Sequence, residues 1–362
     1  MTETKILVMS DEHLRNSIRT MGVTLEEDCR EAIRKVKEVC DVLKPDLVIH
    51  AGDIFDQRKV SPEELHLFRE LMDATGVPEE RHLTIQGNHD RGGEEAIPQS
   101  LGCTSLNGFV YKFNNKLKIT GWDYDQSLAT DRDRIGSLDA DIEVLHFPMS
   151  PFNNRVETAL KLEDVKENRI TIIGDTHVSK LIKKGKRTIL SPGALFPQNK
   201  TELCNDNSTG LWLIIPEENL IQELQLVHRQ GIDLTKETDV EVIRTKINSL
   251  LGKKQGKAAA PPAALTPVVY INDKVSYEDV EEGIIVIRVT EGVELNPLSE
   301  SLESASPSID SIPTLVKQLI EGEEEAKNIS ALIMDMWASN DPAAVLSAWL
   351  KKEEVPIETD NQ

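Results

Sequence analysis

The first 200 residues of the chain alternate short β-rich runs with helical patterns, and this alternation restricts the fold more than any other feature. Apolar residues recur at spacings of three and four from Glu26 to Leu43, which predicts an amphipathic helix that Pro45 ends. A second helix is expected over Pro62–Ala74, with the proline in its first turn. The expected strands are Lys5–Met9, Leu47–Ala51, His82–Gln86, 117–121, 142–146, 169–173 and 188–190. This repetition predicts an α/β fold whose sheet is largely parallel, at least at its start.

Acidic and histidine residues follow five of these strands, at the edge where an open α/β sheet places its ligands. The clusters are Ser10–His13, Gly52–Asp53, Gly87–Asp90, His146 and Gly174–His177. Each cluster alone is typical of an ordinary loop or turn. Together, after strands that one sheet could gather, they favour a shared two-metal site with mixed nitrogen and oxygen ligands, which suit Mn, Fe or Zn better than Ca. The candidate ligands are Asp11, His13, Asp53, Asn88, His146, Asp175 and His177.

These motifs resemble those of the calcineurin-like metallophosphoesterases, and within them the SbcD-type nuclease subunit of bacterial and phage recombination exonucleases. The matching stretches are Ser10–His13, Glu26–Cys29, Pro45–Asp56, Ser61–Pro62 and Gly87–Asp90. The resemblance is specific over residues 4–91, moderate to about residue 200 and faint beyond. It implies a four-layer α/β/β/α sandwich with a smaller α+β cap domain and a C-terminal helical segment.

The resemblance also implies a role for each site residue. Asp11, His13 and His177 would hold one metal ion, Asp53 would bridge, and Asn88, His146 and Asp175 would hold the second. His89 would face the scissile phosphate without binding metal, and Asp90 would orient it by a hydrogen bond. The implied cofactors are two divalent ions, Mn first and Mg second. The family's last motif usually reads Gly-His-x-His, and the carboxylate of Asp175 at that position should favour Mn or Mg over softer ions.

Charge and cysteine usage limit the class of protein. The net charge of −21 argues against a basic DNA-coating protein or a polybasic membrane binder, although nearly half of it lies in residues 293–362. The four cysteines form no CxxC pair, no signal sequence precedes Ile6, and no apolar run approaches the roughly 18 residues of a spanning helix. We therefore expect a cytoplasmic protein with no membrane partner, and the resemblance implies a bacterial cell or a phage-infected host.

The sequence changes character after about residue 205, which predicts four segments. They are a metallophosphoesterase (nuclease) domain at 1–205, a capping, DNA-binding α+β domain at 206–291, a flexible linker at 292–312 and a C-terminal helical partner-binding segment at 313–362. The elements expected in the capping domain are strands at Gly210–Ile215, Gln222–Val227 and Ile284–Val289 and a helix at Asp239–Leu251.

The function implied by the resemblance is a metal-dependent DNA exonuclease or endonuclease that works with an SbcC-type coiled-coil ATPase in recombination and double-strand-break repair. A basic run suits phosphate contact, or equally a solvated hairpin face: Lys180, Lys183, Lys184, Lys186 and Arg187. No base-reading motif is present, so DNA binding should be independent of sequence. Relatives also suggest a homodimer.

Two other functions remain open from the sequence. One is a stand-alone metallophosphatase or phosphodiesterase acting on a small phosphoester, and the other is a non-catalytic scaffold that keeps the fold. The apolar stripe expected in a helix over Ile329–Leu350 could dock on the ATPase or pack on its own domain.

Overall fold

The computed structural model describes residues 3–15, 26–90, 97–129, 131–150, 152, 159–204, 209–224, 226, 229, 231–250, 267–272 and 285–289. All of them belong to the first of two compact units, Met1–Leu295. The predicted linker at 292–312 and the predicted C-terminal segment at 313–362 lie outside the described residues.

The first of two six-stranded sheets has the order β12-β11-β1-β2-β3-β4. Strands β1 to β4 run parallel, β11 lies antiparallel beside β1, and β12 lies antiparallel beside β11. Its strands are β1 (Ile6–Met9), β2 (Leu47–His50), β3 (His82–Thr84), β4 (Thr104–Ser105), β11 (Leu211–Ile215) and β12 (Leu220–Leu224). The strands predicted at Gly210–Ile215 and Gln222–Val227 correspond to β11 and β12, which extend this sheet.

The second sheet has the order β5-β6-β7-β8-β10-β9, with four parallel strands at its centre and an antiparallel strand at each edge. Its strands are β5 (Val110–Phe113), β6 (Leu117–Trp122), β7 (Ile142–His146), β8 (Ile170–Gly174), β9 (Lys180–Lys184) and β10 (Arg187–Ser191). The two sheets face each other, and an apolar core lies between them with Ile6, Ile49, Ile119 and Ile172 all fully buried.

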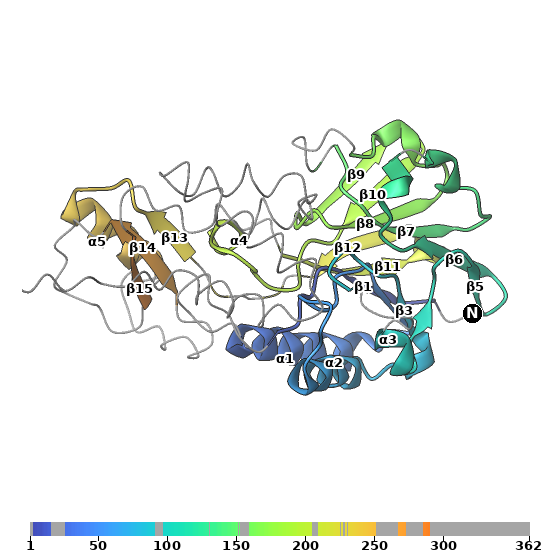
Figure 1. The fold of residues 1–362 in the computed structure, drawn as a ribbon, viewed down its shortest axis with the longest axis horizontal. Coiled ribbons are helices and arrows are strands. Elements are labelled where there is room, and N and C mark those ends of the chain that lie inside the picture. The colour runs from blue at the N-terminus through green and yellow to red at the C-terminus, as the bar shows by residue number, and fades with distance from the viewer. Residues whose placement is uncertain are drawn as a thin grey trace, which may run out of the picture. The chain divides into compact units, whose positions relative to one another are not determined.

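Two helices cover the outer face of the first sheet, as Figure 1 shows for α1 (Glu26–Leu43) and α2 (Pro62–Thr75). The bounds of α1 agree with the predicted helix, and its apolar stripe is buried against β1 and β2. Ser61 caps α2 by accepting from the Glu64 N–H, while the Glu64 side chain accepts from the Ser61 N–H. Such a cap stabilises a helix by about 1 kcal/mol.

The outer face of the second sheet packs against short 3₁₀ turns within the described residues. They are η2 (Gln126–Ala129), η3 (Arg132–Arg134) and η4 (Leu162–Asp164). The predicted α/β sandwich is confirmed, with single turns where the α/β/β/α layering would place longer helices. The remaining short elements are η1 (Glu79–Arg81), α3 (Ile97–Ser100), α4 (Lys200–Leu203) and η5 (Pro216–Glu218).

A separate three-stranded parallel sheet follows, in the order β13-β14-β15. It consists of β13 (Gly231–Leu234), β14 (Val268–Asn272) and β15 (Ile285–Val289), with α5 (Val240–Leu250) between β13 and β14 in the chain. Ile243 and Ile247 of α5 bury their side chains against Val269 and Ile271. The predicted helix and last strand are confirmed, whereas β13 and β14 were not expected. The capping domain at 206–291 stays a prediction.

Candidate metal centre

The residues predicted as metal ligands follow strands of both sheets. Asp11 and His13 follow β1, Asp53 follows β2, and Asn88 follows β3, all in the first sheet. From the second sheet, His146 ends β7, and Asp175 and His177 follow β8. The expectation that one sheet could gather them was therefore wrong. The carboxyl ends of two facing sheets meet, and the candidate site lies between the loops of both.

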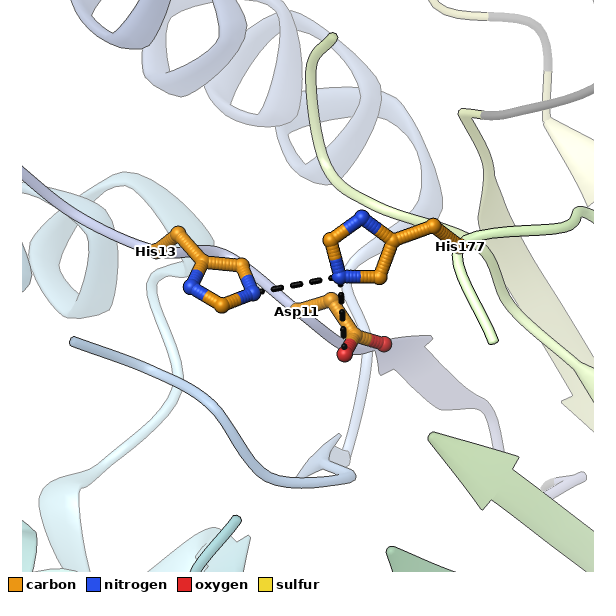
Figure 2. A group of neighbouring side chains, drawn as sticks. All are labelled: Asp11, His13 and His177. Carbon is orange, nitrogen blue, oxygen red and sulfur yellow. Dashed lines mark hydrogen bonds and ion pairs between the residues drawn. The ribbon is translucent and has the colours of Figure 1, made fainter. Parts of the chain in front are cut away.

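Asp11, His13 and His177 form the first group of donors, shown in Figure 2. The Nε2 atoms of His13 and His177 lie 3.2 Å apart, and His177 Nε2 lies 3.4 Å from Asp11 Oδ1. Asp11 and His13 are buried, whereas about a quarter of the His177 side chain is exposed. This group is therefore reached from the His177 side.

Asp53 lies between this group and the next one. Its Oδ2 atom is 3.6 Å from His13 Nε2 and 3.2 Å from His146 Nε2. His146 Nε2 also lies 3.1 Å from Asn88 Oδ1. One carboxylate oxygen thus faces an imidazole on each side, which is the arrangement a bridging ligand needs.

Asp175 stands at the rim of the second group. Its Oδ1 atom lies 3.9 Å from His146 Nε2, and its backbone N–H donates to Asp11. Burial raises the pKa of the Asp175 carboxyl to about 6, because water no longer stabilises its charge. The three compact donor groups found among the described residues do not include Asp175, so its place in the metal shell stays a prediction.

The ring orientations of two histidines are fixed from behind. The Nδ1–H of His146 donates to the Ala51 carbonyl at 2.8 Å, and the Nδ1–H of His177 donates to Glu202 Oε1 at 2.7 Å. When these rings are neutral, each Nε2 therefore presents a lone pair to the centre. Metal-binding histidines are held in this way by a carbonyl or carboxylate on the far nitrogen.

The charges of the centre also fit cations. Burial acts to lower the pKa of His146 and His177, but the carboxylates around them outweigh it and raise both well above the ordinary value. Burial acts to raise the pKa of Asp53, yet His146 outweighs it and the pKa falls. Protons on the rings thus balance the carboxylates. Bound divalent cations would take over that balance and release the protons, as expected when a metal displaces them.

The backbone of the centre is unusual. Ten non-glycine residues in the described part of the chain have a positive φ, and half of them are predicted ligands. These are Asp11, His13, Asp53, Asp175 and His177. Left-handed conformations cost free energy for such residues and persist where the surroundings impose them, which is common at functional sites.

At two glycines near the strand ends, Gly87 and Gly174, neighbouring side chains lie too close for any residue with a Cβ atom. A Cβ atom on Gly87 would lie 1.9 Å from Asp53 Oδ1, and one on Gly174 would lie 2.5 Å from His146 Nδ1. Any larger residue would displace a predicted ligand. The glycines therefore let the two loops approach the centre.

The structure corrects one contact at His89. Asp90 was expected to orient His89 by a hydrogen bond, but it accepts from the backbone N–H groups of Ile54, Phe55 and Gly87. His89 Nδ1 instead donates to the Asp56 carbonyl at 2.8 Å. Sequence adjacency had suggested the wrong partner, because the turn directs the Asp90 side chain toward the β2 loop.

Sequence reasoning also missed two carboxylates behind the centre. Asp56 lies 3.4 Å from His13 Nδ1 and accepts from Arg15, and its position had been given no role. Glu202 lies 25 residues beyond His177 in α4, where it accepts from the Gln198 N–H and Asn199 as well. The capping pattern from Asn199 to Glu202 predicts a helix start but does not say which histidine lies beside it.

Residues 4–204, more than half of the chain, match the calcineurin-like phosphoesterase superfamily domain. The chain belongs to the calcineurin-like phosphoesterase superfamily. The resemblance seen in the sequence motifs is thereby confirmed. The phosphoesterase is a phosphoester hydrolase of a superfamily that uses divalent metal ions, and its described residues contain clusters able to hold them.

A curated relative of the phosphoesterase is the DNA double-strand break repair protein Mre11 of Nanoarchaeum equitans, which is 34% identical over 115 residues. The match covers 29% of this chain and 32% of the relative, so the chain spans about a third of that protein's length. Within the described residues, no helix combines the length and the apolar character needed to cross a membrane.

Two solved structures are also similar to the phosphoesterase. TT1561 of Thermus thermophilus has a TM-score of 0.41 and 12% identity, with 62% of this chain and 99% of that chain covered. The Escherichia coli phosphoesterase Yfce has a TM-score of 0.33 and 14% identity, with 61% of this chain and 98% of that chain covered.

Proposed function

We propose that this phosphoesterase is a two-metal phosphodiesterase that cleaves DNA. The observation that carries the proposal is the position of Asp53, whose Oδ2 atom faces both His13 and His146. A carboxylate between two donor groups suits a pair of cations that share one ligand, as in two-metal hydrolysis of phosphate esters.

The proposed ligand shells divide along Asp53. Asp11, His13 and His177 hold the first ion, Asn88, His146 and Asp175 hold the second, and Asp53 bridges. The mixture of imidazole, amide and carboxylate donors supports Mn, with Mg as the alternative. When bound, the ions supply a hydroxide at neutral pH and neutralise the charge of the phosphate.

His89 is the proposed proton donor for the leaving oxygen. Because a carbonyl only accepts, the hydrogen bond to Asp56 keeps a proton on His89 Nδ1 and leaves Nε2 to give or take one. The backbone N–H of His89 donates to Asp53 Oδ1 at 2.9 Å, which ties the residue to the proposed bridging ligand. This placement supports general acid catalysis beside the ions.

The choice of DNA rests on the Mre11 relative and on a basic hairpin. Strands β9 and β10 form an antiparallel hairpin directly after the His177 loop. Lys180, Lys183 and Lys184 on β9 are exposed, as is Lys186 in the turn, whereas Arg187 is paired with Glu167. Lys180 begins the hairpin at the end of the sheet that carries the centre, and Lys183 and Lys184 lie toward the opposite end. Exposed lysines along this hairpin suit contacts to the phosphates of a duplex that do not depend on base sequence.

The proposed partners extend beyond the DNA. By the same resemblance, the phosphoesterase works with an SbcC-type ATPase in recombination and double-strand-break repair, as a homodimer in the cytoplasm. The segment proposed to bind the ATPase, at 313–362, lies outside the described residues.

The test compares linear duplex DNA with p-nitrophenyl phosphate esters, each with Mn²⁺. We expect DNA cleavage that falls in the double variant Lys183→Ala/Lys184→Ala, with a salt dependence that is weaker by about one unit for each lost phosphate contact. The matched control Lys37→Ala/Lys44→Ala removes the same charge from exposed positions on and just after α1 and should leave cleavage unchanged. Hydrolysis of the small esters without DNA cleavage would overturn the proposal in favour of a small-phosphoester phosphatase.

A further inference from the structure

A chain of buried polar side chains lies behind the loop that carries Asp11 and His13. Glu12 Oε1 lies 2.6 Å from His50 Nδ1, and His50 Nε2 lies 3.0 Å from His82 Nδ1. His82 Nε2 in turn lies 3.2 Å from Thr75 Oγ1, at the end of α2. Glu12, His50 and His82 are fully buried, and Thr75 is nearly so. The proposed metal centre uses none of them.

The hydrogen bonds between these four side chains all run in one direction, with each donor on the side of Glu12 and each acceptor on the side of Thr75. The Thr75 hydroxyl donates its single hydrogen to the Met72 carbonyl at 2.7 Å, so it can only accept from His82. His82 therefore carries its hydrogen on Nε2 and accepts from His50 Nε2–H through its own Nδ1. Burial lowers the pKa of both rings to about 3, so both are neutral at neutral pH. Glu12 is then the donor to His50.

The second oxygen of Glu12 agrees with this direction. Oε2 is buried, with no hydrogen-bond partner among the described residues. A neutral carboxyl group leaves only a carbonyl oxygen unpaired, whereas an ionised one would leave buried charge unpaired at a much higher cost. The four side chains thus form a closed series, in which every donor has an acceptor, and the series ends at Thr75 of α2.

Glu12 sits between two residues with strained backbone. Asp11 and His13 have φ values of 50° and 39°, and both side chains belong to the candidate centre. Their N–H groups donate to Gly52 and Asp53 at 3.0 and 2.9 Å. These backbone bonds tie Asp11 and His13 to the loop after β2. The side chain of Glu12, between them, adds an anchor to His50 of β2 itself.

We propose that Glu12 is a positioning residue, held by His50, His82 and Thr75, that fixes the Asp11–His13 loop in its ligand-presenting conformation. The proposal deepens the proposed function, since it takes the Asp11–His13 loop to be part of a metal centre. Glu12 itself touches neither metal nor substrate in this role.

The first test uses the metal-free protein and therefore does not depend on metal binding. In Glu12→Leu we expect the Asp11 and His13 amides to exchange with deuterium at least about tenfold faster, because the loop loses its anchor. Thr75→Val removes only the far end of the series and serves if Glu12→Leu does not fold; it should speed the same amides by about threefold. The matched control is Asp28→Leu, which removes a buried carboxylate of α1 that is paired with Arg229, and it should leave these amides unchanged.

The second test measures Mn²⁺ affinity by calorimetry on the folded variants. Glu12→Leu should weaken binding by about tenfold, as for other groups that orient ligands, and Glu12→Gln should restore most of it because an amide still donates to His50. A purely structural role would lower thermal stability without moving affinity or loop exchange. Unchanged exchange of Asp11 and His13 in both Glu12→Leu and Thr75→Val would overturn the proposal. Absence of Mn²⁺ binding by the wild-type protein would instead overturn the proposed function, while the exchange result still decides the role of Glu12.

Discussion

Two clusters of histidine and acidic residues share the loop after β1, and they behave in opposite ways. In the candidate metal centre, the Nε2 atoms of His13 and His177 face each other at 3.2 Å, and carboxylates raise the pKa of the rings. In the buried series from Glu12 to Thr75, His50 donates to His82 and His82 donates to Thr75. Burial lowers the pKa of both rings. The same residue types thus form a converging set of lone pairs in one place and a closed series in the other.

The difference teaches how such clusters should be interpreted. A series that pairs every donor with an acceptor is complete without a ligand. A cluster whose lone pairs all point to one place needs a cation or protons there to balance them. The count of histidines and acids in a sequence does not separate these cases, whereas the direction of each hydrogen bond does.

The largest expected effect comes from removing the shared ligand of the converging cluster. Asp53→Asn keeps the size of the side chain but weakens its hold on both ions, so phosphodiester hydrolysis should fall by about 1,000-fold or more. Steady-state cleavage of a bis-p-nitrophenyl ester with Mn²⁺ measures this. Activity within tenfold of wild type would remove Asp53 from the centre.

The next prediction separates ligands from the proposed proton donor. His89→Ala should lower DNA cleavage by roughly 100-fold or more, because the leaving oxygen loses its acid, while the number of Mn²⁺ ions bound stays the same. Cleavage assays and metal analysis of the same sample give both values. Loss of bound Mn²⁺ in this variant would make His89 a ligand instead, which its place near His13 and Asp53 also allows.

A smaller effect should follow when the converging cluster keeps its ligands but loses a supporting group. Glu202→Gln weakens the acceptor behind His177 and should reduce Mn²⁺ affinity by about tenfold. Calorimetric titration of the variant against wild type checks this. His146 offers a contrast, because its support is the Ala51 carbonyl and no side-chain substitution removes it. Unchanged affinity in Glu202→Gln would show that the position of His177 does not depend on Glu202.

The last prediction concerns the closed series, whose removal should change the pH dependence of stability and leave the metal ligands in place. The pKa of His82 is lowered to about 3 in the folded protein from an ordinary value of 6.5. The unfolded chain therefore binds the extra proton first, and the stability due to His82 is lost as pH falls from about 6.5 toward 3. This loss is at most about 1.4 kcal/mol per pH unit. Urea unfolding of wild type and His82→Phe at several pH values should show a shallower decline in the variant, and equal slopes would contradict it.

Much of the fold followed from local sequence. The apolar spacing of α1 and the Ser61 and Pro62 start of α2 predicted both helices, because periodicity and capping act within a few residues. Strand β9 escaped prediction because it is a lysine-rich edge strand with only two half-buried apolar residues, Leu181 and Ile182. The division into two sheets came from the family resemblance and not from the strand patterns, since central strands such as β2 and β7 are buried throughout and look alike in sequence.

The candidate site was predictable in part, because its residues stand at the ends of strands that the sequence pattern shows. The strand ends identified the seven predicted ligands, because parallel strands bring their carboxyl ends to one edge. The supporting contacts were not predictable, because they join distant segments. Glu202 reaches His177 from α4, and Asp90 turns to the β2 loop instead of to its neighbour His89. These contacts depend on backbone directions that residue spacing does not specify.

The central claim is that two cations share Asp53. A crystal of the full chain soaked with Mn²⁺, with anomalous scattering data collected at the manganese edge, tests it most directly. We expect two anomalous peaks about 3.5–4 Å apart on either side of the Asp53 carboxylate, one near His177 and one near His146. A single peak, or peaks away from Asp53, would contradict it.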